Sequence, residues 1–308
     1  MMADAATSRE ASWFQATARQ RVAGLLDPNS FTEFLGPSER GHSPHLQQFD
    51  LPAAFDDGVV IGRGTLDGRD VLVAAQEGQF MGGTFAEVSG AKLVGLVRAA
   101  RDHRDLPQTV LLLMDSGGVR LQEANAGELA VAELMRAIVQ ARSAGVAVIA
   151  LVGGRAGAFG GAGLTAATCS RIAVSGQGRI GVTGPEVIET NKGVEEFDAA
   201  NKALVWSVDG GKNRRLIGGA DAYADDSMDR FRTAAKALLA RVPAFDLTVM
   251  QAEQERLAAR QRRLGACDDA VSMWRLLGID DPEAIRDMSG KDFATLANGI
   301  KEANHDAR

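Results

Sequence analysis

Two glycine-rich stretches follow two predicted buried strands, and both could present backbone N–H groups to a ligand. The apolar run at 110–114 ends in DSGGVR, and the apolar run VAVIALV at 146–152 ends in GGRAGAFGGAG. Glycine is a common turn residue, so either stretch alone is explained more simply as an ordinary turn. Because the carboxyl ends of parallel strands meet at one edge of a sheet, the two stretches together predict a ligand site. N–H donors that converge from two turns form an oxyanion hole, which stabilises negative charge on a carbonyl oxygen.

Other catalytic motifs are missing or weak in this sequence. It contains neither a G-x-x-x-x-G-K-[ST] phosphate loop nor a G-x-S-x-G motif around Ser116, which disfavours P-loop nucleotide chemistry and serine-hydrolase chemistry. A G-x-G-x-x-G match at residues 176–181 follows the short predicted strand RIAVS. Gly184-Pro185 interrupts the helix that would carry a pyrophosphate, so a dinucleotide site is disfavoured as well.

Histidines and charged residues give no clear catalytic or metal site. His42 and His45 lie in a Pro-containing loop without a neighbouring Cys or acidic motif, so a surface loop is favoured over a metal site. Asp115 and Arg120 could form a structural pair that brackets the first glycine turn. A predicted helix near the C-terminus carries a basic cluster, which is interpreted as a solvated face, with docking of an acidic partner as the minority interpretation. The cluster consists of Arg256, Arg260, Arg262 and Arg263.

The predicted site therefore has donors for an oxyanion but no evident nucleophile, general base or metal. Such a site suits a reaction in which a negative charge appears on a carbonyl oxygen. Enolate chemistry on a thioester is the obvious candidate.

The elements that would position these turns alternate between strands and helices. Residues 59–77 predict a hairpin around Asp67-Gly68. The next segments predict a helix, a strand, a helix and a strand at 90–104, 110–114, 129–142 and 146–152. Strand, crossover helix and strand form a βαβ unit, which implies a largely parallel sheet surrounded by helices.

The two ends of the chain are predicted to be mainly helical. An amphipathic N-terminal helix should stop at Asp27-Pro28. Further helices are predicted near Pro185, Phe197 and Asp229. A charged helix from about Gln251 should lead into a polar tail.

Composition limits the class of protein. The chain has 308 residues, is 45% hydrophobic and carries a formal net charge of -6, so it can bury a large core and is poorly suited to nucleic acid. Its only two cysteines, Cys169 and Cys267, cannot build a disulfide framework or a four-cysteine zinc site. With neither a membrane-spanning stretch nor a signal-peptide pattern, we expect a cytoplasmic protein.

Four linked motifs resemble the carboxyltransferase β-type subunits of the crotonase superfamily. They occur in the order GQFMGGTFAEVSGAKLVGLVRAA, LLLMDSGGVRLQE, GGRAGAFGGAG and RIGVTGPEVIE, and TARQRVAGLLDPNSFTEF resembles the N-terminal helix and loop of that family. Within the superfamily the chain looks most similar to β subunits of biotin-independent malonate decarboxylases. Two distant cysteines cannot form the zinc ribbon usual in the acetyl-CoA carboxylase subunit, and the segment after GPEVIE looks like the malonate decarboxylase version.

The resemblance implies a fold and a domain organisation. The implied fold is an α/β, crotonase/ClpP-like ββα superhelix with mixed sheets and flanking helices. An N-terminal helix and loop would occupy 1–50, a crotonase-like core 51–245 and a C-terminal helical extension 246–308.

The resemblance also implies roles for individual residues. Backbone N–H groups from each glycine pair would bind the thioester oxygen, and the first glycine pair's neighbour Ser116 would contact substrate. A second set of residues would lie along the pantetheine arm. Phe159 could exclude water from the departing carboxylate, although core packing explains this residue more simply. The donors would be Gly117 or Gly118 and Gly160 or Gly161, and the arm-binding residues Gly82, Gly83 and Thr84.

The implied activity is that of a malonyl-S-acyl-carrier-protein decarboxylase β subunit. No metal or directly bound cofactor is expected, and the substrate would ride on a CoA-like phosphopantetheine arm of a carrier protein, or on CoA. The expected partners are a homologous γ subunit, the acyl carrier protein and an acyl-transferase subunit. Three alternatives stay open: a biotin-dependent acyl-CoA carboxyltransferase subunit, a non-catalytic subunit that docks the carrier protein, and a crotonase-type peptidase.

Overall fold

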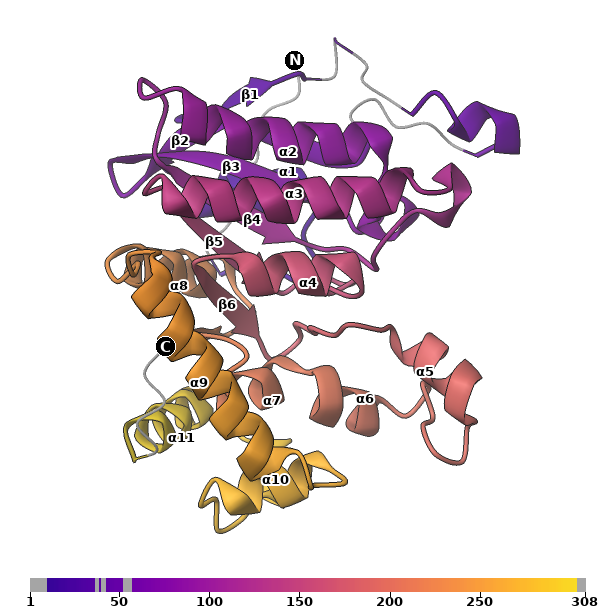
Figure 1. Cartoon of the computed structure of the whole chain (residues 1–308), viewed down its shortest axis with the longest axis vertical. Helices are drawn as coiled ribbons and strands as arrows, with labels where there is room; N and C mark the ends of the chain where they lie inside the picture. The colour runs from indigo at the N-terminus through magenta and orange to yellow at the C-terminus, as the bar shows by residue number, and fades with distance from the viewer. Residues whose placement is uncertain (1–9, 37–38, 40–42, 52–56, 304–308) are drawn as a thin grey trace.

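A mixed β-sheet forms the centre of the computed structural model, which describes residues 10–36, 39, 43–51 and 57–303 (Figure 1). Across the described part of the chain the sheet has seven strands, and their order in space is their order in the sequence. The strands β1 to β3 pair antiparallel, and β3 to β7 pair parallel. The strands are β1 (Thr32–Phe34), β2 (Val59–Leu66), β3 (Arg69–Gln76), β4 (Thr109–Met114), β5 (Ala147–Val152), β6 (Arg171–Ser175) and β7 (Ala222–Ala224). The predicted α/β fold with a mixed sheet and flanking helices is confirmed.

The predicted hairpin is present as β2 and β3, and a carboxylate holds its turn. Asp67 and Gly68 have φ angles of 58° and 73°, the left-handed conformation that a tight two-residue hairpin turn requires. Asp27 accepts hydrogen bonds from both of their N–H groups, at 3.0 and 2.9 Å, and from the Thr65 hydroxyl at 2.6 Å. The residue where the N-terminal helix was predicted to stop therefore anchors the first hairpin.

Helices cover both faces of the sheet. The helices α2 (Glu87–Asp102), α3 (Ala126–Ser143) and α4 (Gly161–Thr168) pack on one face, and α1 (Ala18–Leu25) and α8 (Met228–Leu239) pack on the other (Figure 1). Residues 110, 112 and 114 of β4 face the first layer, and residues 111 and 113 face the second. Because both faces are buried, the strand is a continuous apolar run rather than an alternating one.

The connection between β6 and β7 carries a helical arm that lies beside the sheet (Figure 1). It contains α5 (Pro185–Lys192), α6 (Lys202–Asp209) and α7 (Gly211–Leu216). Helices near Pro185 and Asp229 are confirmed. The predicted helix at Phe197 is wrong, because Phe197 lies between turns and the next helix begins at Lys202, where the Asn201 side chain caps the Leu204 N–H.

The C-terminal region has a hydrophobic cluster of its own. The charged helix is present as α9 (Leu247–Leu264), and it is followed by α10 (Ala270–Leu276), the 3-10 turn η4 (Glu283–Ile285) and α11 (Gly290–Ala303). Trp274, Ile285 and Phe293 are at most 1% exposed, and they pack with Leu216 of α7. The prediction of a polar tail is therefore wrong: its apolar residues are spaced for short helices that bury them against one another. None of the helices described in the structure has the length and apolar character needed to cross a membrane.

Candidate functional site: converging glycine turns

Short parallel bridges join the loops at the carboxyl edge of the sheet. Ser116 pairs with Ala158, and Ala158 pairs with Ile180. The Ser116 N–H donates to the Gly157 carbonyl at 2.7 Å, and the Phe159 N–H donates to the Ser116 carbonyl at 3.0 Å. These bonds bring the loops that follow β4, β5 and β6 together, as the sequence predicted for the first two.

The two glycine pairs lie against each other. A Cβ added to Gly118 would lie 3.9 Å from the Cα of Gly160 and 3.4 Å from the Phe159 carbonyl oxygen. Gly118 has φ 125° and Gly160 has φ 55°, conformations that L side chains rarely adopt. Gly161 is the first residue of α4, and a Cβ there would meet the Val131 side chain of α3 at 2.4 Å. The backbone conformation therefore favours glycine at Gly118 and Gly160, and packing against α3 favours it at Gly161.

The N–H groups of the two pairs differ in how they are used. The Gly117 N–H donates to the Gly82 carbonyl at 2.8 Å, so it is already engaged. The Gly118 N–H has only the Ser116 hydroxyl, at 3.2 Å within its own turn. Among the residues that the structure describes, the N–H groups of Gly160 and Gly161 have no hydrogen-bond acceptor. The free donors are therefore at the start of α4, where the helix dipole also favours negative charge.

A third turn, at residues 82–84, packs beneath the first glycine pair. A Cβ on Gly83 would lie 1.8 Å from the Asp115 carbonyl oxygen, so only glycine fits there. The Thr84 hydroxyl donates to the Met81 carbonyl at 2.9 Å and accepts from Arg120 Nε at 3.3 Å. The predicted arm-binding residues thus adjoin the predicted oxyanion donors in space.

Two other predicted substrate contacts are inside the fold. The Ser116 side chain is buried, and its hydroxyl also lies 3.3 Å from the Gly118 carbonyl. Phe159 is 4% exposed, and a Cβ on Gly181 would touch its ring at 3.0 Å. Both residues therefore support the turns from below, in agreement with the simpler explanation of Phe159 as core packing.

Asp115 and Arg120 do not pair with each other, so that interpretation is wrong. Asp115 binds Arg21 of α1 at 2.8 Å, and both side chains are buried. Asp115 also accepts the Ala156 N–H at 2.7 Å, and Cβ atoms on Gly78 or Gly154 would overlap its carboxylate. This carboxylate therefore holds three segments around the start of the first glycine turn. Sequence spacing could not identify Arg21, because the two partners are 94 residues apart.

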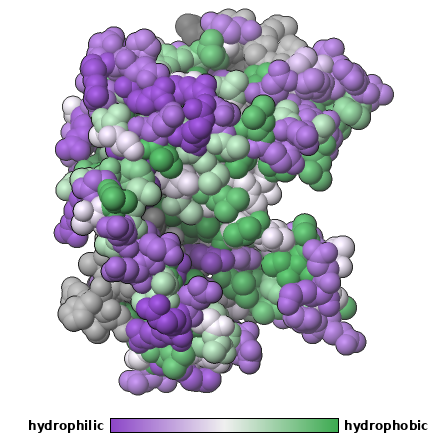
Figure 2. Space-filling view, viewed as in Figure 1, coloured by the Kyte–Doolittle hydropathy of each residue, from purple (hydrophilic) through white to green (hydrophobic). Residues whose placement is uncertain are grey.

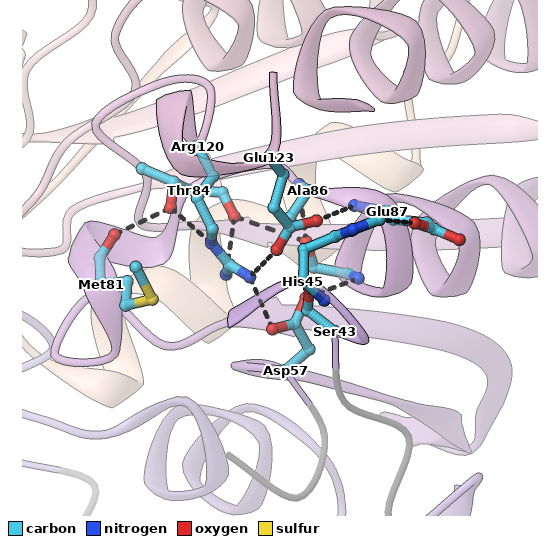
Figure 3. Close-up of polar contacts among 10 residues, drawn as sticks. Ser43, His45, Asp57, Met81, Thr84, Ala86, Glu87, Arg120 and Glu123 are labelled. Carbon is cyan, nitrogen blue, oxygen red and sulfur yellow. Dashed lines mark hydrogen bonds and ion pairs between the residues drawn. The ribbon is translucent and has the colours of Figure 1, made fainter. Parts of the chain in front are cut away.

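Arg120 instead lies at the centre of a buried polar cluster that the sequence did not reveal (Figure 3). Its Nη1 donates to Asp57 at 2.7 Å and to Glu123 at 3.0 Å. Burial raises the pKa of Asp57 more than the Arg120 charge lowers it. Burial would also raise the pKa of Glu123, but hydrogen bonds from Ser43, the Glu87 N–H and Arg120 outweigh it and lower that pKa.

The edge of this cluster contains a group with metal-ligand chemistry. His45, Glu87 and Glu123 each place a ligand atom within 4.8 Å of the other two. His45 Nε2 lies 2.6 Å from Glu87, and Glu123 already accepts from Arg120 and from the Glu87 N–H at 3.1 Å. In this structure the three side chains are part of a hydrogen-bond network with Arg120 and the Glu87 N–H. His42 lies outside the described residues.

Arg179 is a further cation at the same edge, and only its position after β6 could have pointed to it in the sequence. Its guanidinium lies between the rings of Phe159 and Trp206, at 5.4 and 4.8 Å. Burial lowers the pKa of Arg179, although the negative charges of Glu186 and Asp209 act to raise it. Burial also raises the pKa of Asp209, which binds Arg214 at 2.8 Å.

Neither the dinucleotide motif nor the basic helix forms a ligand site of the kind considered. The Gly178 N–H donates to the Ser175 carbonyl and the Gly181 N–H to the Ala158 carbonyl, so these groups are not free to hold phosphate. In α9, Arg256 binds Glu253, Arg260 donates to the Ile217 carbonyl and Arg263 to the Leu276 carbonyl. Arg260 and Arg263 therefore tie α9 to neighbouring segments, whereas the Arg256–Glu253 pair lies within α9.

Comparisons with known proteins show the family of this chain. The family model described as Carboxyl transferase domain matches residues 14–263. The malonyl-S-ACP:biotin-protein carboxyltransferase MADC of Malonomonas rubra is 38% identical over 315 residues, which cover 95% of this chain and 98% of that protein. A chain of the Pseudomonas malonate decarboxylase hetero-tetramer, solved in complex with malonate, is 40% identical with a TM-score of 0.78, covering 87% of this chain and 97% of that one.

More distant similarity extends to acyl-CoA enzymes. The methylmalonyl-CoA carboxyltransferase 12S subunit of Propionibacterium freudenreichii subsp. shermanii is 32% identical over 74% of this chain but only 40% of its own length. A transcarboxylase 12S structure aligns at 29% identity with a TM-score of 0.61. The predicted crotonase-like fold of the carboxyltransferases is confirmed. Because the family model spans most of the chain and the similarity to MADC covers nearly all of both proteins, this chain belongs to the carboxyl transferase domain family.

Proposed function

We propose that this chain is the β subunit of a biotin-independent malonyl-S-acyl-carrier-protein decarboxylase. The observation that carries the proposal is the meeting of two glycine turns, with free N–H donors at Gly160 and Gly161 and a weakly engaged one at Gly118. The similarity to a subunit of Pseudomonas malonate decarboxylase supports malonyl as the acyl group.

The reaction would need little more than these donors. The bond between the malonyl carboxylate and its α-carbon breaks, CO2 leaves, and the electron pair moves into the thioester to form an enolate. N–H groups from Gly118 and from Gly160 or Gly161 would bind the enolate oxygen, which carries more charge in the transition state than in the substrate. A proton added to the α-carbon then gives the acetyl thioester. Its source would be water or a partner subunit.

Gly82, Gly83 and Thr84 are proposed to guide the thioester's pantetheine arm toward the donors. They lie directly under the first glycine turn, since the Gly82 carbonyl accepts the Gly117 N–H at 2.8 Å. The arm would belong to the CoA-like prosthetic group of an acyl carrier protein, or to CoA. An acyl-transferase subunit would load the carrier with malonyl.

A homologous γ subunit is proposed to cover the glycine turns. Several large apolar side chains in the segments around these turns are exposed, and exposed apolar patches typically mark protein interfaces. Figure 2 shows hydrophobic residues on both sides of the indentation between the body of the molecule and the arm that carries α5 and α6. A hetero-dimer of Pseudomonas malonate decarboxylase subunits is 39% identical in one chain, with a TM-score of 0.64. The exposed side chains are Leu121, Leu129, Leu164, Val182, Val187 and Val194.

A second candidate is a biotin-dependent carboxyltransferase subunit. It is favoured by the similarity over nearly the full chain to MADC, which is named a malonyl-S-ACP:biotin-protein carboxyltransferase. The same oxyanion donors would serve it, because CO2 leaves the malonyl thioester in both reactions. Only the fate of CO2 differs: release in one case, and transfer to biotin in the other.

The deciding experiment measures loss of malonyl thioester by this chain, alone and with its γ partner, using malonyl-CoA and malonyl carrier protein. Avidin is added and biotin is left out. We expect CO2 release that requires the partner and is insensitive to avidin. Turnover that depends on added biotin protein and is blocked by avidin would contradict the first candidate and support the second. If neither occurs with either thioester, both are wrong and a docking subunit is favoured.

A further inference from the structure

Arg120 connects the two turns of the candidate site that would hold the thioester. It follows Gly118 by two residues, and its guanidinium reaches back to the turn at 82–84, where Nε contacts the Thr84 hydroxyl at 3.3 Å and Nη2 the Thr84 carbonyl at 3.4 Å (Figure 3). The other side of the guanidinium binds Asp57 and Glu123. The side chain is 1% exposed, so solvent does not compete for these contacts.

The backbone around Arg120 repeats the same connection. The Phe85 N–H donates to the Gly118 carbonyl and the Arg120 N–H donates to the Phe85 carbonyl, both at 2.8 Å. Phe85 therefore fixes the backbone on the C-terminal side of Gly118, through the Gly118 carbonyl and the Arg120 N–H. The guanidinium prevents the two turns from moving apart, because it is held on one side by Thr84 and on the other by two carboxylates.

We propose that Arg120 is a positioning residue that sets the Gly118 N–H in the direction needed for the oxyanion by fastening the 116–118 turn to the 82–84 turn. The inference rests on the proposed function. Arg120 itself touches no reacting atom, because its donors are directed at Asp57, Glu123 and Thr84.

The contacts of Arg120 depend on the planar shape of its guanidinium group. Contacts to Thr84, Asp57 and Glu123 diverge from three different nitrogens of one planar group. A lysine ammonium at the same place keeps the positive charge but has a single nitrogen. It can contact either the two carboxylates or Thr84, but not both sides at once. Replacing buried ion pairs by apolar residues is often neutral or stabilising, so this cluster is not explained by stability alone.

Arg171 offers a matched control at the opposite edge of the sheet. It is 9% exposed, donates to Asp221 at 3.1 Å and to the Arg241 carbonyl at 3.3 Å, and is the first residue of β6. The glycine turns follow the other ends of the strands. Arg171→Lys removes a comparable buried guanidinium group and leaves the glycine turns unchanged.

The test compares Arg120→Lys and Arg171→Lys in the assembled complex with the wild type. We expect Arg120→Lys to lower kcat by about 100-fold, the effect of displacing a reacting group by about 1 Å, with KM changed by no more than about twofold. Arg171→Lys should lower the Tm without changing kcat. A wild-type kcat for Arg120→Lys would overturn the inference, and so would equal losses of kcat and Tm in both variants.

A second variant covers the case in which Arg120→Lys does not fold. Asp57→Asn keeps the size of the side chain, and asparagine tolerates the φ of 51° found there. It weakens one anchor of Arg120, and we expect a kcat loss of about 10-fold with an unchanged KM. No kcat loss in a folded Asp57→Asn complex would overturn the inference. If the wild-type complex itself releases no CO2, the proposed function and this inference fail together, whereas wild-type turnover isolates the role of Arg120.

Discussion

Gly118 and Gly160 face each other across two turns, with a Cβ on Gly118 only 3.9 Å from the Cα of Gly160. Each turn follows a different strand of the parallel part of the sheet, so the pair depends on the sheet register and on the bridge between Ser116 and Ala158. The sheet and this bridge therefore bring the proposed oxyanion donors of the two turns together.

Gly118→Ala should therefore impair turnover far more than stability. A side chain is strained at φ 125°, so we expect the backbone at Gly118 to rotate and to move its N–H group. Loss of one oxyanion donor costs about 100-fold to 1,000-fold in kcat. Steady-state decarboxylation of the complex measures the effect. A variant with full activity would favour a docking role over catalysis.

The matched control is Gly145→Ala. Gly145 also has a positive φ, of 89°, but nothing lies within 4 Å of the added Cβ, and the residue precedes β5 at the far edge from the glycine turns. The backbone strain should cost about 1 kcal/mol of unfolding free energy and leave kcat unchanged.

Arg21→Met should be strongly destabilising. It leaves the Asp115 carboxylate buried without its partner, and breaking a buried ion pair in this way costs about 3 to 5 kcal/mol. Urea unfolding measures the change. The corresponding surface substitution, Lys192→Met, removes an exposed pair with Glu196 and should give no resolvable change. Equal effects of the two substitutions would contradict the structural role of Asp115.

Asp27→Asn should lower stability in a pH-dependent way. Burial would raise the pKa of Asp27, but hydrogen bonds from Thr65, Gly68, Arg232 and Asp67 outweigh it and hold that pKa well below its usual range. A lowered pKa in the folded state means that the carboxylate stabilises the fold above its unfolded pKa, and that this contribution is lost as the pH falls through the folded value. The stability gap between wild type and variant should be constant near pH 7 and narrow below about pH 4. A gap that stays the same down to pH 3 in urea titrations would contradict the role of Asp27.

Leu164→Asp should weaken assembly with the proposed γ subunit and spare the fold of this chain. Leu164 is 42% exposed on α4, the helix that begins at the free N–H donors. Analytical ultracentrifugation of the mixed subunits measures the association. Leu276→Asp is the control, because Leu276 is 51% exposed on α10 in the C-terminal cluster. If both variants assemble normally, the partner binds a different face.

Strong local patterns made the core of the fold predictable. The apolar run of β4, the hairpin signal Asp67-Gly68 and the helix before β5 are short-range features, and all three are present. The polar tail and the helix at Phe197 were wrong, because short helices and their ends depend on side-chain caps such as Asn201 and on packing around Trp274.

The candidate site was predictable only in part, for a related reason. Glycine pairs after strands can be read from sequence order, and their meeting follows from the parallel sheet. The charged residues that hold the turns are far apart in sequence: Arg21 and Asp115 by 94 residues, and Asp57 and Arg120 by 63. Spacing alone therefore suggested the wrong pair, Asp115 with Arg120.

The agreement between strand order and chain order affects how the protein can be made. Each strand from β2 to β7 pairs with the strand synthesised just before it, so the sheet can grow from the β2–β3 hairpin as the chain leaves the ribosome. One set of contacts can form only after most of the chain has been synthesised. Trp13 stacks on Phe231 at 4.1 Å, and the Phe14 N–H binds Asp226, 212 residues later in the chain. The glycine turns can thus form during translation. The N-terminal segment packs against α8 and stabilises the sheet only after α8 has left the ribosome.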